Sequence, residues 1–480
     1  MPARKTKIIA TMGPSTDNPE ILRELIKSGM DVARYNFSHG DHDTVKKRLD
    51  TFRAVCAELG ADTAALADTK GPEIRLGDFA GGFTELAAGA EFRLTTEECE
   101  GGAGRASITY AGLPAEVSEG VKILVDDGLI VLEVKGSYET EIITKVVNGG
   151  RVSNHKSVNV PSVPLKLPFI SGRDRADLRF IADMGFDYIA ASFTRSQGDI
   201  RELRAALQPL QRSGIQIIAK IENAEGVSNL DSIIDASDGL MVARGDLGVE
   251  LPFEHIPILQ KSMIQMCNRR GKAVITATQM LESMVQNTRP TRAEVSDVAN
   301  AIFDGTGAIM LSAETAAGKH PVEAFKAMAN IAEHTERSIN YMDLFRSNSY
   351  GEDHTVMNAI SRAAVTTAHE LGAAAILAVT LSGATARNIA KYRPSCPIVA
   401  CTPDASVLRQ LKLVWGVLPL KMDEQLETGA LFTHAAELGA KKAGLREGDL
   451  VVIAAGVPLG TVGSTNMIKV YEIGEGYTVF

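Results

Sequence analysis

Two apolar runs in the chain end in charged residues whose spacing suits chemistry on a bound anion. Lys220 and Glu222 close the first run, and because they are two residues apart, a strand would place both side chains on one face. Asp246 follows the next run. Two carboxylates could hold a divalent cation beside the ammonium, and such a site suits a phosphorylated anion. The alternative is an internal Lys–Glu ion pair with an unrelated aspartate in a turn.

Further groups that bind anions or cations follow other apolar runs. They are Arg34, Asn36, Ser38, Lys70, Arg75 and Thr278. The sequence has no Gly-x-x-x-x-Gly-Lys-Ser/Thr loop and no Gly-x-Gly-x-x-Gly at a helix start, which argues against a P-loop or Rossmann nucleotide site. Side chains, a metal ion and helix ends must then hold any phosphate. The backbone N–H groups of Gly245 and Asp246 could receive a carboxylate, with the Thr278 hydroxyl beside them.

The elements that must position these residues are eight short apolar runs, which alternate with amphipathic stretches. The predicted strands are Lys7–Thr11, Val32–Asn36, Thr63–Ala67, Tyr188–Ser192, Ile215–Ile221, Leu240–Ala243, Ala273–Thr276 and Ala308–Leu311. Seven of these eight runs pass directly into polar or glycine residues. Eight βα units with polar groups at the carboxyl ends of the strands predict a (β/α)8 barrel, in which residues distant in sequence converge.

The alternation is interrupted once, after the third strand. Between Pro72 and about Pro168, short runs rich in Val, Ile and Thr and frequent glycines predict an inserted all-β domain, with a proline-rich hinge at Val160–Pro168. Beyond about Tyr341, helices and five strands predict an α/β domain; these strands are Ala374–Thr380, Ile398–Thr402, Gly416–Leu420, Leu450–Ala454 and Met467–Ile473. We expect barrel parts at 1–71 and 169–341, an inserted β-barrel lid at 72–168 and a C-terminal α/β regulatory domain at 342–480.

Length and composition indicate a large globular protein. The 480 residues exceed what one hydrophobic core usually serves, and the net charge of −9 argues against a nucleic-acid surface. No apolar run is long enough to cross a membrane, and Met1–Ile9 is too short for a signal peptide, so we expect a cytoplasmic protein without a membrane or nucleic-acid partner. Five scattered cysteines without Cys-x-x-Cys spacing indicate that most of them are buried thiols without a chemical role.

Six segments of the chain together resemble the pyruvate kinase family. They are Arg34–Gly40, Asp68–Arg75, Lys220–Asn223, Met241–Gly248, Ala277–Met284 and Pro290–Asn300. The resemblance covers nearly the whole chain and includes the order of the domains. It implies a barrel with a mobile β lid and a regulatory domain, usually in a homotetramer. It also implies the glycolytic transfer of a phosphoryl group from phosphoenolpyruvate to ADP, giving ATP, and protonation of the enolate to pyruvate.

The resemblance assigns the charged residues to phosphoryl transfer. Glu222 and Asp246 would ligate Mg2+ or Mn2+, and oxygen ligands suit so hard an ion. Lys220 would neutralise charge on the phosphoryl group in transfer, and Arg34 would clamp the phosphate with its planar fork. These four residues would form the catalytic centre.

The resemblance also implies a site for the substrate carboxylate. Thr278 would bind that carboxylate together with the amides of Gly245 and Asp246. The polar chain that delivers a proton to the methylene carbon would contain Thr278 and Ser312.

A monovalent cation and the nucleotide have implied ligands as well. The residues that resemble the family's K+ ligands are Asn36, Ser38, Asp68 and Thr69. Glu73 strengthens that interpretation, because relatives that work without K+ tend to carry Lys at this position. The residues implied for the nucleotide, ADP or ATP, are Asn36, His39, Arg75, Asp127 and Lys156.

A loop in the C-terminal domain resembles the family's site for a phosphorylated allosteric effector. Its residues are Thr380, Ser382, Gly383 and Thr385, between a predicted strand and helix. A capped helix start without a ligand is the alternative. In regulated relatives a Trp and an Arg grip fructose bisphosphate, and neither is evident in Gly456–Asn466. A monophosphate such as AMP or a ribose phosphate therefore fits better.

Two other functions remain open from the sequence. Another metal-dependent barrel enzyme acting on pyruvate enolates, such as an aldolase or a synthase that uses phosphoenolpyruvate, would share the metal carboxylates but would not need the inserted domain. A catalytically inactive effector-binding scaffold would usually lack a catalytic lysine or a metal carboxylate, and here both kinds of residue are present.

Overall fold

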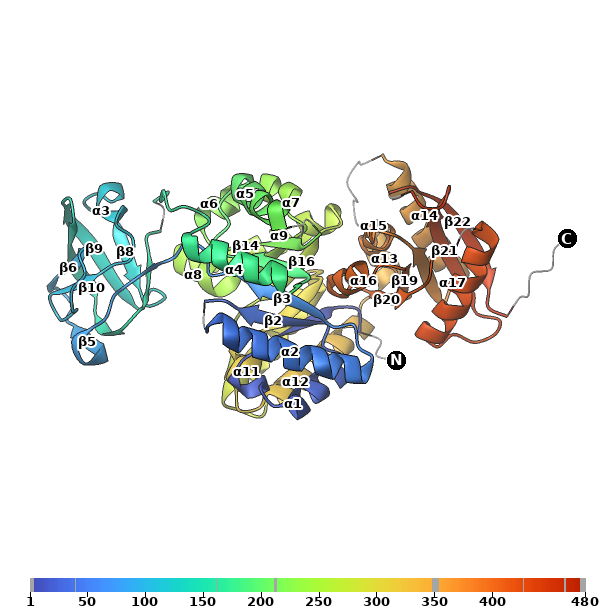
Figure 1. The fold of residues 1–480 in the computed structure, drawn as a ribbon, viewed down its shortest axis with the longest axis horizontal. Helices are drawn as coiled ribbons and strands as arrows, with labels where there is room; N and C mark the ends of the chain where they lie inside the picture. Colours follow the sequence, from blue (N-terminus) through green and yellow to red (C-terminus); the bar gives the residue numbers. More distant parts are fainter. Residues whose placement is uncertain are drawn as a thin grey trace.

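The computed structural model describes residues 4–38, 40–161, 163–210, 214–347, 354–425, 427–461 and 463–474. Three parts follow one another along the longest axis of the molecule (Figure 1). The inserted β structure lies at one end, a (β/α)8 barrel in the middle and an α/β sheet with its helices at the other end. Within the described residues, no helix is both long and apolar enough to cross a membrane.

The barrel consists of eight parallel strands that close on themselves in the order β1-β17-β16-β15-β14-β13-β3-β2. The strands are β1 (Lys7–Thr11), β2 (Val32–Asn36), β3 (Ala64–Asp68), β13 (Tyr188–Ala191), β14 (Gln216–Ile221), β15 (Gly239–Ala243), β16 (Ala273–Ala277) and β17 (Ala308–Leu311). All eight predicted strands are present, three with the predicted bounds and five with ends that differ by one residue. The predicted barrel is confirmed.

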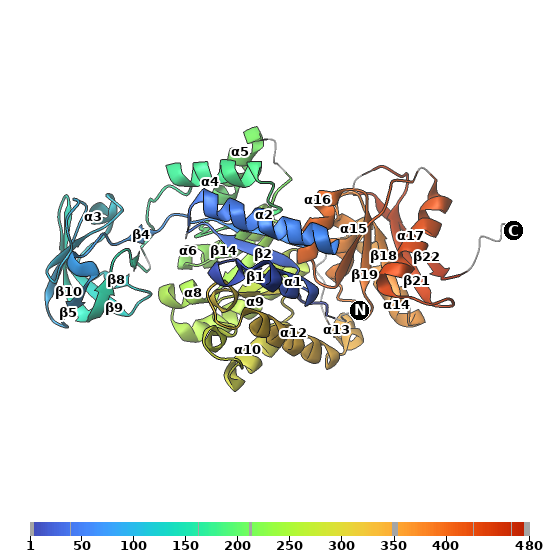
Figure 2. The same cartoon turned by 60° about the horizontal axis from the view of Figure 1, so that its bottom comes forward.

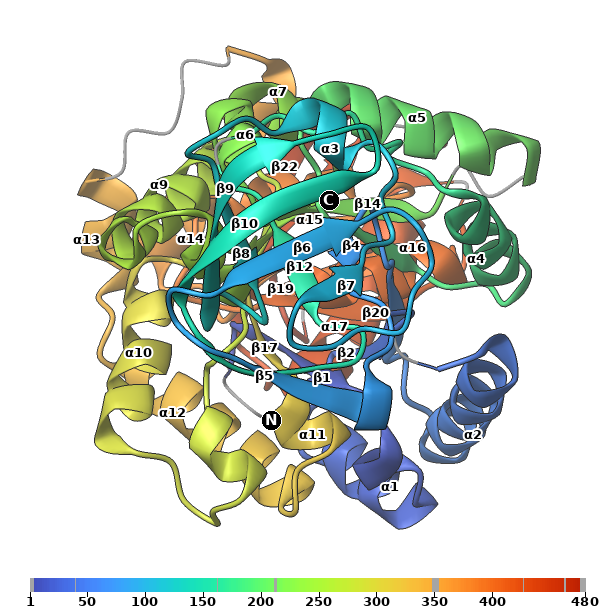
Figure 3. The same ribbon diagram turned by 90° about the vertical axis from the view of Figure 1, so that its left-hand side faces the viewer.

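Helices surround the barrel as an outer ring (Figure 3). They are α1 (Pro19–Lys27), α2 (His42–Leu59), α4 (Gly172–Asp183), α5 (Gln197–Leu207), α6 (Ala224–Ser228), α7 (Leu230–Ala236), α8 (Arg244–Glu250), α9 (Ile256–Arg269), α10 (Arg292–Phe303), α11 (Ala313–Ala316) and α12 (Pro321–Arg337). Short 3-10 turns are η1 (Pro14–Thr16), η3 (Gln208–Leu210), η4 (Phe253–His255) and η5 (Glu282–Val285). Local sequence sets the helix starts: Asp41 caps α2, and Thr291 with Glu294 forms a capping box on α10.

Two apolar shells hold the barrel together. Side chains that point inward, among them Ile9, Leu66, Ile218, Met241 and Ile275, fill its interior. Side chains on the other face of each strand pack against the ring of helices. Because both faces of each strand are buried, the strands read as continuous apolar runs in the sequence rather than as alternating ones.

The insertion between β3 and α4 is predominantly β structure. Its strands are β4 (Ile74–Arg75), β5 (Phe83–Leu86), β6 (Glu91–Thr95), β7 (Arg105–Ser107), β8 (Lys122–Val125), β9 (Ile130–Ser137), β10 (Glu141–Asn148), β11 (Gly150–Ser153) and β12 (Ser157–Asn159), with the short helices η2 (Ala80–Gly82) and α3 (Leu113–Glu116). Seven strands form one sheet in the order β4-β12-β8-β9-β10-β6-β7, and β11 pairs with β5. A single bridge between Leu76 and Ile108 joins the two edges, so this sheet curls towards a barrel without a continuous closing ladder.

Gly71 marks the chain's first crossing into the insertion. Its φ of +70° is in the left-handed region, and a Cβ there would lie 2.8 Å from the Ser192 carbonyl oxygen. The backbone therefore passes closer to Ser192 than any side chain would allow. The insertion, called the lid below, has its own apolar core and stands apart from the ring of barrel helices (Figures 1 and 2).

The C-terminal part is a five-stranded sheet in the order β20-β19-β18-β21-β22, with β22 antiparallel to β21. Its strands are β18 (Ala375–Val379), β19 (Ile398–Thr402), β20 (Val417–Lys421), β21 (Leu450–Gly456) and β22 (Thr465–Glu472). Its helices are α13 (Tyr341–Ser347), α14 (Val356–Leu371), α15 (Ala384–Ala390), α16 (Ala405–Gln410), η6 (Leu411–Leu413) and α17 (Thr428–Ala443). The five predicted strands are present, as the α/β interpretation requires.

This C-terminal part packs against the end of the barrel opposite the lid (Figure 2). The Tyr188 hydroxyl, at the start of β13, donates to the carbonyl of Gln410. Next to it, the Arg409 guanidinium donates to Asp187 at 2.7 Å. Leu413 packs with the side chains that fill the barrel. The amino ends of the strands are thereby covered, which leaves the carboxyl ends facing the lid.

Two buried tyrosines of the barrel give a matched test of this packing. No described residue bonds the buried Tyr35 hydroxyl, whereas the Tyr188 hydroxyl bonds Gln410. We expect Tyr35→Phe to leave stability unchanged or raise it, since it removes an unsatisfied polar group. Tyr188→Phe should lower it by about 1 kcal/mol, because a buried carbonyl loses its donor. Thermal unfolding midpoints compare the two variants, and a larger loss for Tyr35→Phe would contradict this assignment.

Candidate active site

A buried lysine lies at the centre of a polar network at the carboxyl ends of the barrel strands. The Lys220 ammonium, on β14, lies 3.0 Å from Asp68 Oδ1 and 2.9 Å from Glu222 Oε1, and it donates to Ser192 Oγ at 2.7 Å. Lys220 is 9% exposed, and both carboxylates are 1% exposed. The two-residue spacing thus places Lys220 and Glu222 side by side, as predicted.

Asp68 connects this lysine to the predicted phosphate clamp. Its Oδ2 accepts from Arg34 Nε at 2.7 Å, while its Oδ1 accepts from Lys220 and from Ser192 Oγ at 3.0 Å. Arg34 is further held by Thr11, whose Oγ1 accepts from Nη1 at 2.9 Å. One carboxylate therefore fixes two cations that come from different strands.

The charges in this network stabilise one another against burial. Burial alone would lower the pKa of Lys220, but the Asp68 and Glu222 carboxylates outweigh that effect and raise it. Burial would raise the pKa of Asp68, yet Arg34 and Lys220 lower it. Lys220 is therefore a permanent positive charge and Asp68 a permanent negative one at neutral pH.

The negative charge of Glu222 is not fully balanced by its neighbours, which favours a bound cation. Burial raises its pKa, and the neighbouring Asp246 and Asp68 carboxylates add to that effect despite Lys220. A bound cation would relieve this repulsion, so Glu222 and Asp246 fit a divalent metal. Among the described residues no three His, Cys, Asp or Glu side chains converge as a metal cluster. Such a two-carboxylate site leaves positions for substrate oxygens, as Mg2+ sites that act on phosphates do.

A strained turn after β16 carries Thr278, which is predicted to bind the substrate carboxylate. Thr278 and Gln279 have φ values of 66° and 54°, which side-chain-bearing residues rarely adopt. Thr278 Oγ1 accepts from the Gly245 N–H at 2.8 Å, and Arg244 holds the turn by donating to the Thr278 carbonyl at 2.7 Å. The structure therefore brings Thr278 to the first turn of α8, where Gly245 and Asp246 lie.

Ser312 lies beside this turn at the end of β17. A cavity of about 510 Å³ is bordered by Arg34, Asn36, Thr278 and Ser312. The Ser312 Oγ atom is buried, and no described residue bonds it. A hydroxyl with unused hydrogen-bonding capacity next to Thr278 is suited to passing a proton, as the sequence interpretation requires.

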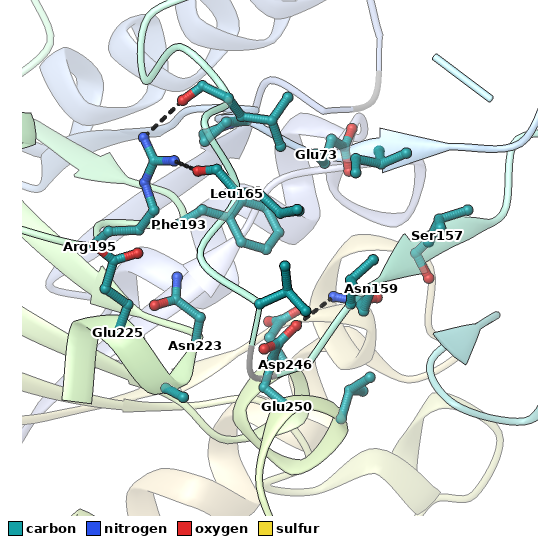
Figure 4. A pocket seen from close by; sticks show the side chains of 18 of the residues that line it. Glu73, Ser157, Asn159, Leu165, Phe193, Arg195, Asn223, Glu225, Asp246 and Glu250 are labelled. Atoms are coloured by element: carbon teal, nitrogen blue, oxygen red, sulfur yellow. Dashed lines mark hydrogen bonds between the residues drawn. The ribbon is translucent and has the colours of Figure 1, made fainter. Parts of the chain in front are cut away.

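A second cavity, of about 370 Å³, separates the lid from the barrel (Figure 4). It is bordered by Arg75 and Asp127 of the lid and by Asp246 of the barrel. Arg75 is held by a two-pronged contact with Glu73, at 2.8 and 2.7 Å. Asn159 of the lid donates to Glu250 of the barrel at 3.3 Å across this cavity.

The predicted nucleotide residues are divided between these two cavities. Arg75 and Asp127 border the cavity under the lid, whereas Asn36 borders the one at the barrel rim. The Lys156 ammonium, which borders neither, pairs with Asp126 at 2.7 Å. His39 lies outside the described residues.

The four residues predicted to bind K+ lie on the ends of two neighbouring strands. Asn36 and Asp68 are register partners on β2 and β3. Asn36 Oδ1 accepts from the Ser38 N–H at 3.0 Å, and Thr69 follows Asp68, its carbonyl accepting from Ser192 Oγ at 2.6 Å. Four oxygen-bearing residues thus come together, which is the donor chemistry of a monovalent cation site.

The C-terminal loop borders a cavity of about 240 Å³, which Thr380, Ser382 and Thr385 help to line. The Gly383 N–H donates to Thr380 Oγ1 at 3.0 Å, so that amide is already used. The Thr385 hydroxyl is buried against Thr465 at 2.6 Å. Ser382, by contrast, is partly exposed, and its hydroxyl bonds neither Thr380 nor Thr385. The lining contains Asp423 and Glu424 but no Lys or Arg among the described residues.

Ser192 is the residue of the network that sequence reasoning missed. Its hydroxyl contacts Lys220, Asp68 and the Thr69 carbonyl, all within 3.0 Å. Its position at the end of a predicted strand was the only signal, because a lone serine carries no motif. The role of Asp68 as partner of both Arg34 and Lys220 was missed as well, since it depends on the closure of the barrel.

The fold and this network define an enzyme class: a barrel phosphotransferase with a lid. Comparison with known proteins agrees. The profile of the pyruvate kinase barrel domain matches residues 3–325, and that of the pyruvate kinase alpha/beta domain matches residues 358–471. The chain belongs to the pyruvate kinase family.

Individual relatives match along almost the whole chain. Pyruvate kinases of Geobacillus stearothermophilus and Staphylococcus saprophyticus are each 48% identical over 474 residues, covering 98% of this chain and 81% of theirs. The crystal structure of a pyruvate kinase from Cryptosporidium parvum superposes with a TM-score of 0.93 at 40% identity, covering 98% of this chain and 96% of that one.

The contacts of Ser192 predict that its hydroxyl is needed for turnover. Ser192→Ala removes the bonds that orient Lys220 and Asp68, so kcat for pyruvate formation should fall by about one to two orders of magnitude. Ser196→Ala is the control from the same loop: it removes the N-cap of α5 and should cost about 1 kcal/mol of stability with kcat unchanged. Equal kcat values for the two variants would contradict this role.

Proposed function

We propose that the network around Asp68 carries the family's reaction, transfer of the phosphoryl group of phosphoenolpyruvate to ADP and protonation of the resulting enolate. The observation that supports this most is that Arg34 and Lys220 both pair with the one buried carboxylate of Asp68, and that Lys220 also pairs with Glu222, at the strand ends that face the lid. Two fixed cations beside a metal-binding carboxylate match a reaction whose barrier is lowered chiefly by positioning and charge.

Phosphoryl transfer assigns different work to the two cations. Arg34, held by Asp68 and Thr11, presents a planar fork that grips the phosphate before and during transfer. Lys220, a compact charge, neutralises the oxygens as the phosphoryl group leaves the enolate oxygen. Because both cations are already fixed, little reorganisation is needed in the transition state.

Two kinds of metal ion have residues that fit them. Glu222 and Asp246 would hold Mg2+ or Mn2+, which when bound supplies Lewis-acid stabilisation of phosphate and enolate oxygens. Asn36, Ser38, Asp68 and Thr69 would hold K+. The Glu73 carboxylate lies 3.2 Å from the Lys70 ammonium and also pairs with Arg75. Its negative charge is therefore balanced by two neighbouring cations.

Enolate protonation falls to the hydroxyls beside the carboxylate site. Thr278 and the first-turn amides of α8 would hold the substrate carboxylate, and the Gly245 N–H, which bonds Thr278 Oγ1 here, would turn to the substrate. This aims the methylene carbon at the cavity that Ser312 borders. The unbonded Ser312 hydroxyl passes a proton towards that carbon. The strained turn at Thr278 fixes this geometry before substrate arrives.

The nucleotide is held between the barrel and the lid. Arg75, Asp127 and Lys156 belong to the lid, whereas Asn36 ends β2 of the barrel. His39 is the fifth residue that we propose for the nucleotide. Their division between two cavities indicates that the lid, which we place at residues 72–168, closes when nucleotide binds. The barrel would then comprise 1–71 and 169–341, and the regulatory domain 342–480.

The two alternatives are not favoured. An aldolase or synthase acting on pyruvate enolates would share the barrel, but the family match extends through the C-terminal domain as well. An inactive scaffold would be expected to lose part of the charged network, which is intact here. A coupled assay of pyruvate formation from phosphoenolpyruvate and ADP, with and without Mg2+ and K+, tests the function.

The half reactions test the role of Lys220. We expect Lys220→Met to reduce phosphoryl transfer by several orders of magnitude while substrate binding stays close to wild type, because Arg34 still holds the ground state. Protonation of preformed pyruvate enolate should survive better than phosphoryl transfer. Rapid-quench transfer and solvent-proton exchange measure the two steps separately. Equal losses in both would assign Lys220 to another step.

We propose further that the C-terminal cavity binds a phosphorylated effector with a single phosphate. Ser382 offers a neutral hydroxyl that can bind one phosphate, whereas the described lining has no Lys or Arg to balance the charge of a second one. AMP or a ribose phosphate fits this site better than fructose bisphosphate does. An effector can activate only by binding the active state more tightly.

Substrate saturation tests this effector site. A monophosphate should lower the half-saturating phosphoenolpyruvate concentration. Ser382→Asp should abolish the response by repelling the phosphate with maximal rate unchanged, while Ser382→Ala should weaken it without abolishing it. Activation by fructose bisphosphate alone would overturn the proposal.

Exposed apolar residues support a homotetramer. On one side of the barrel, Phe253 and Ile258 are 81% and 69% exposed, and on the C-terminal domain Val356 is 65% exposed. Exposed apolar residues on two separate parts of the molecule allow two different isologous contacts, as a dimer of dimers requires. We expect Ile258→Asp to yield dimers in sedimentation velocity, with Val470→Asp on β22 doing the same through the other face. A wild-type monomer would refute this assembly.

A further inference from the structure

The segment 163–168, through which the chain returns from the lid to the barrel, is held to the barrel by one arginine. Arg195 follows β13, and its guanidinium donates to the carbonyls of Leu165 and Leu167 at 3.0 and 2.9 Å (Figure 4). Its Nε lies 3.7 Å from Asp199, and its side chain is 18% exposed. A planar fork that binds two carbonyls two residues apart holds that backbone in one orientation.

Leu165 and Leu167 also belong to the lid. Their side chains pack against the apolar core of the lid, and between them the Lys166 N–H donates to Glu116 of α3 at 2.9 Å. The same short segment is therefore bound to the lid through its side chains and to the barrel through its carbonyls. Any movement of the lid at this crossing must act on Arg195.

The backbone that carries Arg195 leads directly to the proposed catalytic groups. Three residues earlier, Ser192 Oγ contacts Lys220 at 2.7 Å. The Phe193 N–H donates to Glu222 Oε2 at 2.5 Å. Phe193 has a φ of 54°, so its backbone is held in a strained conformation that aims this N–H at Glu222.

Contacts on both sides make this loop stiff. Thr194 is fully buried, and its hydroxyl donates to the Ala191 carbonyl at 2.9 Å. Asn229 donates to the Arg195 carbonyl at 2.9 Å, and a Cβ at Gly226 would lie 2.6 Å from the Thr194 carbonyl oxygen. A loop packed this closely transmits a displacement rather than absorbing it.

We propose that Arg195 is a positioning residue that couples the orientation of the lid to the geometry of Glu222 and Lys220 through residues 192–195, an inference that rests on the roles proposed above for those two groups. The coupling makes metal binding and nucleotide capture interdependent. When Arg195 holds the lid in this orientation, Phe193 positions the Glu222 carboxylate and Ser192 positions the Lys220 ammonium. Releasing the fork lets the lid sample other orientations and loosens both groups together.

Arg195→Gln in the full-length enzyme tests this coupling, with Arg204→Gln as the matched control. Arg204 on α5 also donates to a backbone carbonyl, that of Ala236, and pairs with Asp238 at 2.8 Å, but these bonds do not involve residues 163–168. The readouts are hydrogen exchange of residues 163–168 and 190–196 without ligands, Mn2+ binding by titration calorimetry without substrate, and KM for ADP and for phosphoenolpyruvate.

For Arg195→Gln we expect faster exchange in both segments, Mn2+ affinity about three- to tenfold weaker and KM for ADP raised about tenfold, since two charge-assisted hydrogen bonds are lost. KM for phosphoenolpyruvate should change less than KM for ADP, because that site lies on the barrel. Arg195→Lys keeps the charge and part of the bonding, so it should give intermediate values. Arg204→Gln should match the wild type in all of these.

Unchanged Mn2+ affinity in Arg195→Gln together with a raised KM for ADP would overturn the proposal, because the arginine would then be a hinge contact without a link to Glu222. Wild-type exchange at 163–168 would overturn it too. If Arg195→Gln does not fold, Arg195→Lys supplies the same comparison. A wild-type enzyme that forms no pyruvate would refute the proposed function instead, while exchange and Mn2+ binding would still decide the coupling.

Discussion

The buried carboxylate of Asp68, shared by Arg34 and Lys220, is the interaction on which the site depends. Two cations and two carboxylates cannot be taken out of water cheaply, and the cost is offset only when each charge is paired and hydrogen bonded. Asp68 satisfies that condition for groups from three strands, β2, β3 and β14. The closed barrel makes this possible because it alone brings those strand ends together.

Pairing charges before substrate binds has a chemical consequence. The pKa shifts keep Lys220 protonated and Asp68 ionised, so the site presents fixed charge to a phosphorylated anion instead of acquiring it during the reaction. Glu222 is the exception, because burial and neighbouring carboxylates raise its pKa despite Lys220. That imbalance would favour a bound divalent cation, and the contact of this carboxylate with the loop is the hydrogen bond from the Phe193 N–H.

The C-terminal part and the lid are attached to the barrel in different ways, at its opposite ends. The C-terminal part covers the amino ends of the strands and is joined there by Arg409 and Tyr188, which leaves the opposite end open. The lid stands over that open end and touches the barrel through a few polar contacts, among them those of Arg195 and Asn159. Because these contacts are few and polar, they permit the lid to move. The closely packed interface at the amino ends of the strands does not permit such movement.

The sequence by itself determined the elements and much of the chemistry. Uninterrupted apolar runs predicted all eight barrel strands within one residue, because strands buried on both faces need apolar side chains throughout. The two-residue spacing of Lys220 and Glu222 fixed their common face, and long motifs carried the family resemblance. What only the tertiary structure decided is which groups meet. Ser192, the shared role of Asp68 and the fork of Arg195 depend on contacts between residues 28 to 152 positions apart, and a sequence does not encode such distances locally.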